Sequence, residues 1–459
     1  MASTELSPYA PVTSPATVSS TGDGYSANIR YIELQKELRF VLSAGVTSLA
    51  PSRAGSPLAE RTEEFVRDEQ PNHTTEARAA GRGLLSATTL PRTISKLSTI
   101  KYLKNWFTEC APELDKFDDT QQFGVNIPIL ASKSPALLYA VLAFSARQTE
   151  RRSTQKSHDS LELYQESIRL LGPSCNRAIP MFLPRLFNVT GFSGGLLQAV
   201  FWCYARMELC GLIISNFIEA TVLPLEQWAP SLPAESSPTL SHREQYHTFA
   251  KDLFRKHNSP DMHANFAVYL CTQACDLMRR QIFRVELGEV DTDDQRPFAT
   301  QWQSLWTDLR EWLETRPLEL LPIQSPDSED ASSLFPRILF THWAAISSNQ
   351  LYHTACLILL DTETLGRPPL AIQEQQYSLI WHAKQICGIS MTNPHLGNLV
   401  NAIQPLYLAG RHLSHLEEHL AVARLLKKID RSTGWGALWR LRDLEAAWGY
   451  DAGEILLKV

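Results

Sequence analysis

Apolar residues recur every three to four positions from Ile94 onward, which is the spacing of amphipathic helices. The main stripes fall at Ile100, Leu103, Phe107 and Cys110, at Leu161, Tyr164, Ile168 and Leu171, and at Trp302, Leu305, Trp306, Leu309 and Leu313. No run alternates apolar and polar residues for long enough to indicate a strand. The pattern therefore predicts an all-α body of about ten or more helices packed in layers.

Two segments are apolar around most of their circumference and are predicted to be buried helices. Ser134 and Pro135 supply an N-cap and a first-turn proline for the first, PALLYAVLAFSARQTERR. The second, GLLQAVFWCYARMELCGLII, carries Arg206 and Glu208, each costing about 3 kcal/mol or less at a bilayer midplane, so a core helix is favoured over a membrane span. Further helices are predicted over Phe266 to Leu287, Arg337 to Leu360, Tyr377 to Ile389, Leu399 to Leu408, Ser414 to Ile429 and Gly436 to Trp448.

Residues 1–92 differ in composition from the rest, because they are rich in Ser, Thr, Pro, Ala and Gly and poor in aromatic residues. Such a segment buries too little apolar surface to offset the entropy of ordering, so it is predicted to be disordered, except for a short helix over Tyr31 to Leu42. Residues 93–459 are predicted to form the helical body. The first residues lack a basic start followed by an apolar core, which predicts an intracellular chain without a secretory signal.

The net charge and the cysteine content disfavour two classes of protein. The chain carries 43 Lys and Arg against 49 Asp and Glu, a net charge of −6, which disfavours nucleic-acid binding over its whole surface. Eight cysteines in 459 residues are too few for a disulfide framework, so reduced thiols are expected.

One motif suggests nucleophilic catalysis. Gly191-Phe-Ser193-Gly-Gly195 fits the G-x-S-x-G elbow of α/β hydrolases, which places the serine on a strand-to-helix turn and needs a later His and acid. The other strands of that fold are not visible in the sequence. We favour a structural interpretation, in which Ser193 caps a helix starting at Gly194, and keep a serine hydrolase as the alternative.

A second motif suggests zinc. His412, His415 and His419 are spaced for one helical face, and His415 to His419 also matches the H-x-x-E-H pattern of inverted zinc proteases. That site needs a third, remote ligand, for which Glu445 is the nearest candidate. We favour a solvated, charged helix face.

The remaining candidates also favour structural interpretations. Neither Cys271 and Cys275 nor Cys203 and Cys210 form a C-x-x-C pair, so buried apolar cysteines are predicted. The acidic run EVDTDD lacks the glycine and terminal Glu of a calcium loop, and phosphate-binding glycine motifs do not occur. Core packing is predicted for Trp302, Trp306, Trp343, Trp381, Trp435, Trp439 and Trp448. No catalytic, cofactor-binding or metal-binding residue is therefore predicted, and no cofactor.

Seven long blocks resemble the fungal-specific transcription factor domain, the helical regulatory region that follows a binuclear zinc cluster in fungal regulators. The blocks are Tyr102 to Asp118, Ile127 to Arg151, Leu161 to Leu171, Gly191 to Gly211, Ser347 to Leu360, Ile386 to Leu413 and Ser432 to Tyr450. They span nearly everything after about residue 95, in the family's order. The resemblance implies a helical module without catalysis, acting in the nucleus through protein partners, self-association or a small effector. The resemblance assigns no catalytic or effector-binding residues in this sequence.

This sequence departs from the family's pattern in its cysteines. The family's DNA-binding cluster needs six closely spaced cysteines holding two zinc ions, with basic residues between them. Here the first cysteine is Cys110, and the eight are scattered. We therefore expect no zinc cluster and no direct DNA binding from this chain. Homo- or hetero-association with related regulators is the expected mode of action, and a helical scaffold or sensor outside transcription is a further alternative.

The join at residues 172–190 is a second departure. Similar proteins carry a further pair of apolar helices here, whereas this chain has a short stretch that Pro173, Pro180 and Pro184 prevent from forming a continuous helix. We hypothesise a deletion, an alternative splice or a misread intron. If a helical hairpin is missing, its neighbours should expose apolar surface.

Overall fold

The computed structural model describes residues 95–153, 157–171, 190–218, 228–230, 232, 240–289, 291, 294–323, 333–362 and 375–459. Within these ranges the regular elements are all helical and no strand occurs, so the prediction of an all-α protein is confirmed. Residues 1–92, with the predicted helix over Tyr31 to Leu42, and residues 172–189 of the join lie outside the described ranges.

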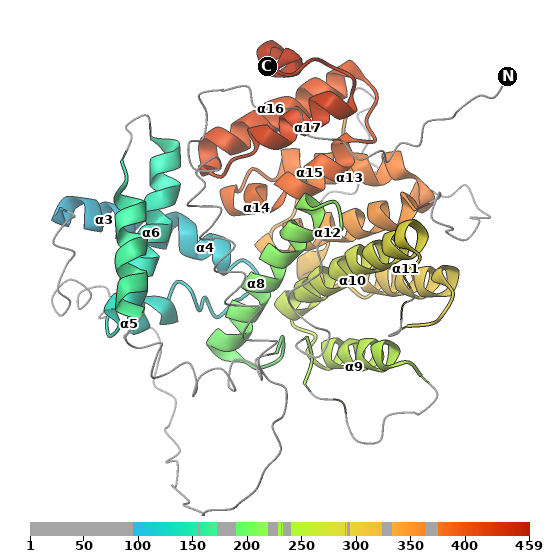
Figure 1. Ribbon diagram of the computed structural model, residues 1–459, viewed down its shortest axis with the longest axis horizontal. Helices are drawn as coiled ribbons and strands as arrows, with labels where there is room; N and C mark the ends of the chain where they lie inside the picture. Colours follow the sequence, from blue (N-terminus) through green and yellow to red (C-terminus); the bar gives the residue numbers. More distant parts are fainter. Residues whose placement is uncertain are drawn as a thin grey trace, which may run out of the picture. The chain divides into compact units, whose positions relative to one another are not determined.

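Successive helices run through the described ranges between Lys96 and Lys458 (Figure 1). Their bounds are α3 Lys96–Asn105, the π-helical turn η1 Trp106–Cys110, α4 Ala111–Leu114, α5 Asn126–Ala131, α6 Pro135–Arg152, α8 Gly195–Ile214, α9 His242–Lys256, α10 Pro260–Leu287, α11 Phe298–Glu314, η3 Leu318–Leu320, α12 Trp343–Leu360, η5 Gln375–Tyr377, α13 Leu379–Thr392, α14 Leu396–Asn401, α15 Ile403–Gly410, α16 Leu416–Thr433, α17 Leu438–Ala447 and α18 Glu454–Lys458. A further helix covers residues 159–171.

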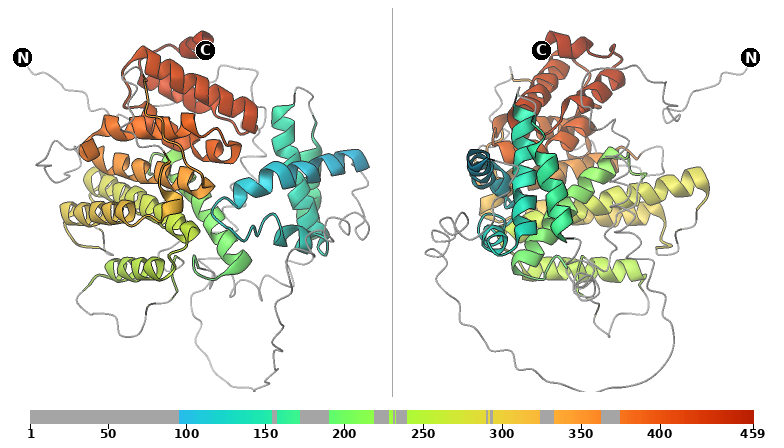
Figure 2. Two further views of the ribbon diagram at one scale, coloured as in Figure 1. Left: turned by 180° about the vertical axis from the view of Figure 1, so that it is seen from behind. Right: turned by 60° about the vertical axis from the view of Figure 1, so that its left-hand side comes forward.

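Helix α12 lies at the centre of the main hydrophobic core, because every residue from Ala344 to Leu360 is buried. It packs against α10, α11, α13 and α15, and α15 in turn contacts α16 and α17. The helices therefore form the layers that the sequence pattern predicts (Figure 1). Helices α3 and α5 pack on α6 around a second, smaller cluster, seen as the blue and teal helices of Figure 2.

The buried surface of α12 includes a run of polar side chains, and several of them bond to neighbouring elements, although Gln350 Oε1 has no partner in the described structure. Asn349 Nδ2 donates to the carbonyl of Leu320 over 3.1 Å, and Gln350 Nε2 donates to Ser390 Oγ over 2.8 Å. A buried polar group without a partner costs about 1–3 kcal/mol, so these bonds fix how α12 sits against η3 and α13.

Two buried imidazoles extend this network. Nδ1 of His353 on α12 lies 2.8 Å from Nδ1 of His382 on α13, and His382 Nε2 contacts the carbonyl of Gln376 over 2.8 Å. Burial lowers the pKa of His382 to about 4 and holds the pKa of His353 well below its usual range. Both rings are therefore neutral at physiological pH, and one can donate its proton to the other.

The first apolar helix of the sequence is confirmed with its cap. Ser134 Oγ accepts from the backbone N–H of Leu137, Pro135 begins α6, and half of the α6 residues are buried. The predicted stripe of α3 is partly wrong: Leu103 and Cys110 are buried, but Ile100 and Phe107 are exposed. The π-helical turn adds a residue to the helical register, and the buried face runs through Thr99, Tyr102, Leu103, Trp106 and Cys110.

The stripe predicted for the helix at residues 159–171 faces outward. The exposed fractions of Leu161, Tyr164, Ile168 and Leu171 lie between 39 % and 45 %. The helix instead buries Leu163 and Ser167, whose hydroxyl donates to the carbonyl of Ala136 on α6. The prediction is wrong because apolar residues lie on both faces of this helix, and the face that is buried also carries Ser167, which a backbone carbonyl satisfies.

The prediction that α8 is buried holds for one face. Ala205, Leu209 and Ile213 lie in the main core, whereas the opposite face exposes Leu197, Val200, Met207 and Ile214. Among the described helices, α8 is the one long and apolar enough to cross a membrane, with 44 % of its most apolar window buried. Its buried Arg206 donates from Nη2 to the carbonyl of Leu114 over 2.8 Å, which is the behaviour of a helix packed in a protein core.

Two helical glycines give a matched test of this packing. A Cβ on Gly388 of α13 would lie 2.3 Å from the carbonyl oxygen of Pro336, whereas a Cβ on Gly211 of α8 would meet nothing within 4 Å. We expect Gly388→Ala to lower the free energy of unfolding by about 1–3 kcal/mol through overpacking. Gly211→Ala should raise it by about 0.5–1 kcal/mol, because alanine favours the helix. Urea unfolding measures both, and equal effects of the two substitutions would contradict the packing described for α13.

Candidate functional site

The segment after α4 folds into a loop held by two aspartates. Asp115 Oδ1 accepts from the backbone N–H of Phe123 and its Oδ2 from that of Gly124, both over 2.7 Å. Asp118 accepts from the backbone N–H of Thr120 and Gln122, each over 3.1 Å. Burial raises the pKa of Asp115 to about 6, and the two backbone donors oppose that rise. The loop is therefore a fixed platform rather than a loose connection.

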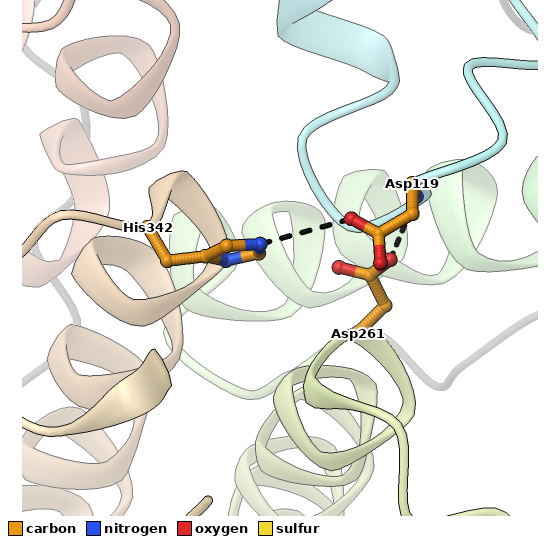
Figure 3. Close-up of side chains that lie close together, drawn as sticks. All are labelled: Asp119, Asp261 and His342. Atoms are coloured by element: carbon orange, nitrogen blue, oxygen red, sulfur yellow. Dashed lines mark hydrogen bonds and ion pairs between the residues drawn. The ribbon is translucent and has the colours of Figure 1, made fainter. Parts of the chain in front are cut away.

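This platform brings Asp119 beside two residues from distant elements. Its backbone N–H donates to Asp261 Oδ2 over 2.7 Å, and its own Oδ1 lies 3.7 Å from Nε2 of His342 (Figure 3). Asp261 belongs to the first turn of α10, where a carboxylate suits the helix dipole, and His342 is the residue immediately before α12. One ligand atom from each of the three side chains lies within 4.8 Å of the others.

Two polar atoms of this trio are buried without a hydrogen-bond partner in the described structure. They are Oδ1 of Asp261 and Nδ1 of His342. Asp261 is 8 % exposed, and Asp119 has 65 % of its side chain exposed. Burial raises the pKa of Asp261 to about 7, the Asp119 amide opposes the rise, and the charge of Asp119 adds to it.

A cleft of about 450 Å³ opens beside the trio. Asp119 and His342 line it together with Pro112, Lys116 and Trp343, whose indole is 41 % exposed. The mixture of charged, polar and aromatic surface is suited to a small polar ligand.

Lys116 lines this cleft and is buried close to the carboxylate of Glu113. Lys116 Nζ donates to the carbonyl of Gly397 over 2.7 Å, which joins the loop to α14. Burial lowers the pKa of Lys116 and raises that of Glu113, and the attraction between them opposes both shifts. Arg206, the one cation of α8, donates to the carbonyl of Leu114 and lies 5.0 Å above the ring of Phe117. These contacts join α8 to the segment around α4.

Ser193 does not have the surroundings of a nucleophile. Its Oγ accepts from the backbone N–H of Thr190 over 2.8 Å, and within the described ranges no His nitrogen or carboxylate bonds to it. The prediction that it caps the following helix is also wrong: α8 begins at Gly195, its N-cap is Gly194 at φ +75°, and Gln198 Oε1 accepts from the Gly194 N–H. The left-handed Gly194 turns the serine back towards the preceding residues.

His415 and His419 have structural roles, and the three histidines do not form a solvated face. His415 is the N-cap of α16, in a capping box with Glu418. His419 is buried: its Nε2 contacts the carbonyl of Leu413 over 3.0 Å, and its ring stacks on Trp448 at 4.0 Å between centroids. Since α16 starts at Leu416, the spacing does not place the three histidines on one helix.

The remote zinc-ligand candidate also has a structural role. Both carboxylate oxygens of Glu445 accept backbone N–H groups at the start of α18, from Gly453 over 2.7 Å and from Ile455 and Leu456 over 2.9 Å each. A carboxylate with these partners serves as a helix cap.

Seven of the eight cysteines are described, all with free thiols, and all are buried except the partly buried Cys210. The prediction of buried apolar cysteines is confirmed for Cys203, Cys271 and Cys275 but not for the partly buried Cys210, and Cys175 lies outside the described residues. Trp302 and Trp306 stack in the core as predicted, whereas Trp343 and Trp439 are exposed at 41 % and 39 %.

Of the acidic run at residues 289–294, Asp294 pairs with Arg296 over 2.6 Å, and three residues of the run lie outside the described ranges.

Comparison with known proteins gives one relative of known role. The chain is 25 % identical over 333 residues to the transcription activator AMTR1 of Alternaria alternata, a match that covers 63 % of this chain and 40 % of the relative. The chain therefore spans less than half the length of that relative. No known family model and no solved structure matches the chain.

Proposed function

We propose that this chain is the helical regulatory body of a fungal-type transcriptional regulator, acting in the nucleus through protein partners or a small effector. The observation that carries the proposal is the similarity to a transcription activator over 63 % of the chain. The described helices agree with the all-α body that the resemblance to fungal regulatory domains implies. The body supplies surfaces and a cleft, and no catalysis is proposed.

We also propose that these 459 residues do not bind DNA through a zinc cluster. Zinc binds thiolates, and burial raises the pKa of the thiols of Cys110 and Cys210 to about 12 and about 11. The described cysteines also lie on separate helices, apart from the α8 pair and the α10 pair. DNA contact would then come from an associated regulator.

The cleft beside the loop of residues 115–125 is the place proposed for an effector. It is formed where the loop meets the segment that leads into α12, and its floor contacts α8 and α14. A ligand in this cleft would contact both the loop and the start of α12. Its binding would therefore change the relative stability of arrangements in which these two segments lie differently.

The localisation and DNA binding of the full chain test the proposal. We expect the chain to be recovered with nuclei from fungal cells and to show no shift of random or promoter DNA at physiological salt, since its net charge is −6. A tight DNA complex formed by the purified chain alone, or residence confined to the cytoplasm, would contradict it.

A fluorophosphonate probe separates this proposal from the serine-hydrolase alternative. We expect no labelling of Ser193, because its Oγ accepts a backbone hydrogen bond and has no described base beside it. Ser193→Ala serves as the matched control. Labelling of the natural chain that disappears in this variant would favour the hydrolase.

A further inference from the structure

We propose that Asp119, Asp261 and His342 bind a divalent transition-metal ion of the zinc type at the edge of the cleft. Each of the three side chains comes from a different element, and their ligand atoms lie within 4.8 Å of one another. Figure 3 shows the two carboxylates and the imidazole turned towards a common space. This inference goes beyond the proposed function and does not depend on it.

The unsatisfied oxygen of Asp261 is the observation that points to an ion. Its Oδ1 is buried without a partner, on a side chain that is 8 % exposed, and no Lys or Arg pairs with this carboxylate in the described structure. Its other oxygen already holds the Asp119 amide, which fixes the direction of the carboxylate. A buried acceptor left unpaired is costly, and a cation bound to Oδ1 removes that cost.

The donor types select the kind of ion. An imidazole nitrogen with two carboxylate oxygens suits Zn²⁺ and neighbouring first-row metals, whereas Ca²⁺ and Mg²⁺ prefer six or more oxygen ligands. Asp119 has 65 % of its side chain exposed and His342 28 %, so the ion would face the cleft on one side. That leaves a coordination position for water or for an oxygen of a bound ligand.

Closing the site needs one small movement. Zinc–ligand distances of about 2.0–2.2 Å require ligand atoms closer together than the present spacing. The carboxylate of Asp119 can make this movement, because 65 % of its side chain is in solvent. Asp261 and His342 are held at the starts of α10 and α12, so they form the preorganised part of the site.

Titration calorimetry on the full chain, freed of metal with a chelator, tests the proposal with Zn²⁺ as the probe. We expect one zinc per chain at this site and at least about tenfold weaker binding in Asp119→Asn and in His342→Gln. Asp119→Asn removes an exposed carboxylate and keeps the backbone N–H that Asp261 needs, so folding should be preserved. His257→Gln removes an exposed histidine elsewhere and is the matched control.

Co²⁺ absorption gives a second measurement, because a site with one imidazole and two carboxylates produces visible d–d bands that Asp119→Asn should weaken. Mg²⁺ and Ca²⁺ should fail to displace the Co²⁺. Absence of zinc binding by the natural chain would overturn the proposal. Equal zinc affinity in the natural chain, Asp119→Asn and His342→Gln would also overturn it, because the ion would then be held elsewhere.

Discussion

The complete burial of α12 is the constraint on which the rest of the structure depends. A helix that carries serine, asparagine, glutamine and histidine can be buried on all sides only if most of these side chains find polar partners on its neighbours. Leu320, Ser390 and His382 supply such partners from η3 and α13. These bonds fix the layers around α12, and the fixed start of α12 in turn places His342 at the cleft.

The fold was predictable from the sequence where apolar spacing and capping agree. The start of α6 at Ser134 and Pro135 and the core position of Trp302 and Trp306 follow directly from local pattern. The buried faces predicted for α3 and for the helix at residues 159–171 were partly or wholly wrong, because apolar residues lie on both faces of these helices and spacing alone does not select between them. Helix α9 was not predicted. Its start nevertheless has a local signal, because Ser241 and Glu244 have the S-x-x-E spacing of a capping box.

The candidate site could not be predicted, because its residues are far apart in the chain and lie in no shared motif. Asp119 and Asp261 are 142 residues apart and meet through one backbone hydrogen bond. The local motifs that drew attention, at Ser193 and at His415 to His419, have structural roles instead. Helix α8 and the helix at residues 159–171 both expose apolar side chains, and the missing hairpin stays a hypothesis because residues 172–189 lie outside the described ranges.

The central claim is that this chain is a regulatory body that acts on transcription through DNA-bound partners. Tethering it to a heterologous DNA-binding domain in a fungal reporter strain tests this most directly. The account predicts that the tethered chain changes reporter output relative to the DNA-binding domain alone. An unchanged reporter, with the fusion shown to be nuclear, folded and bound to its operator, would contradict the account.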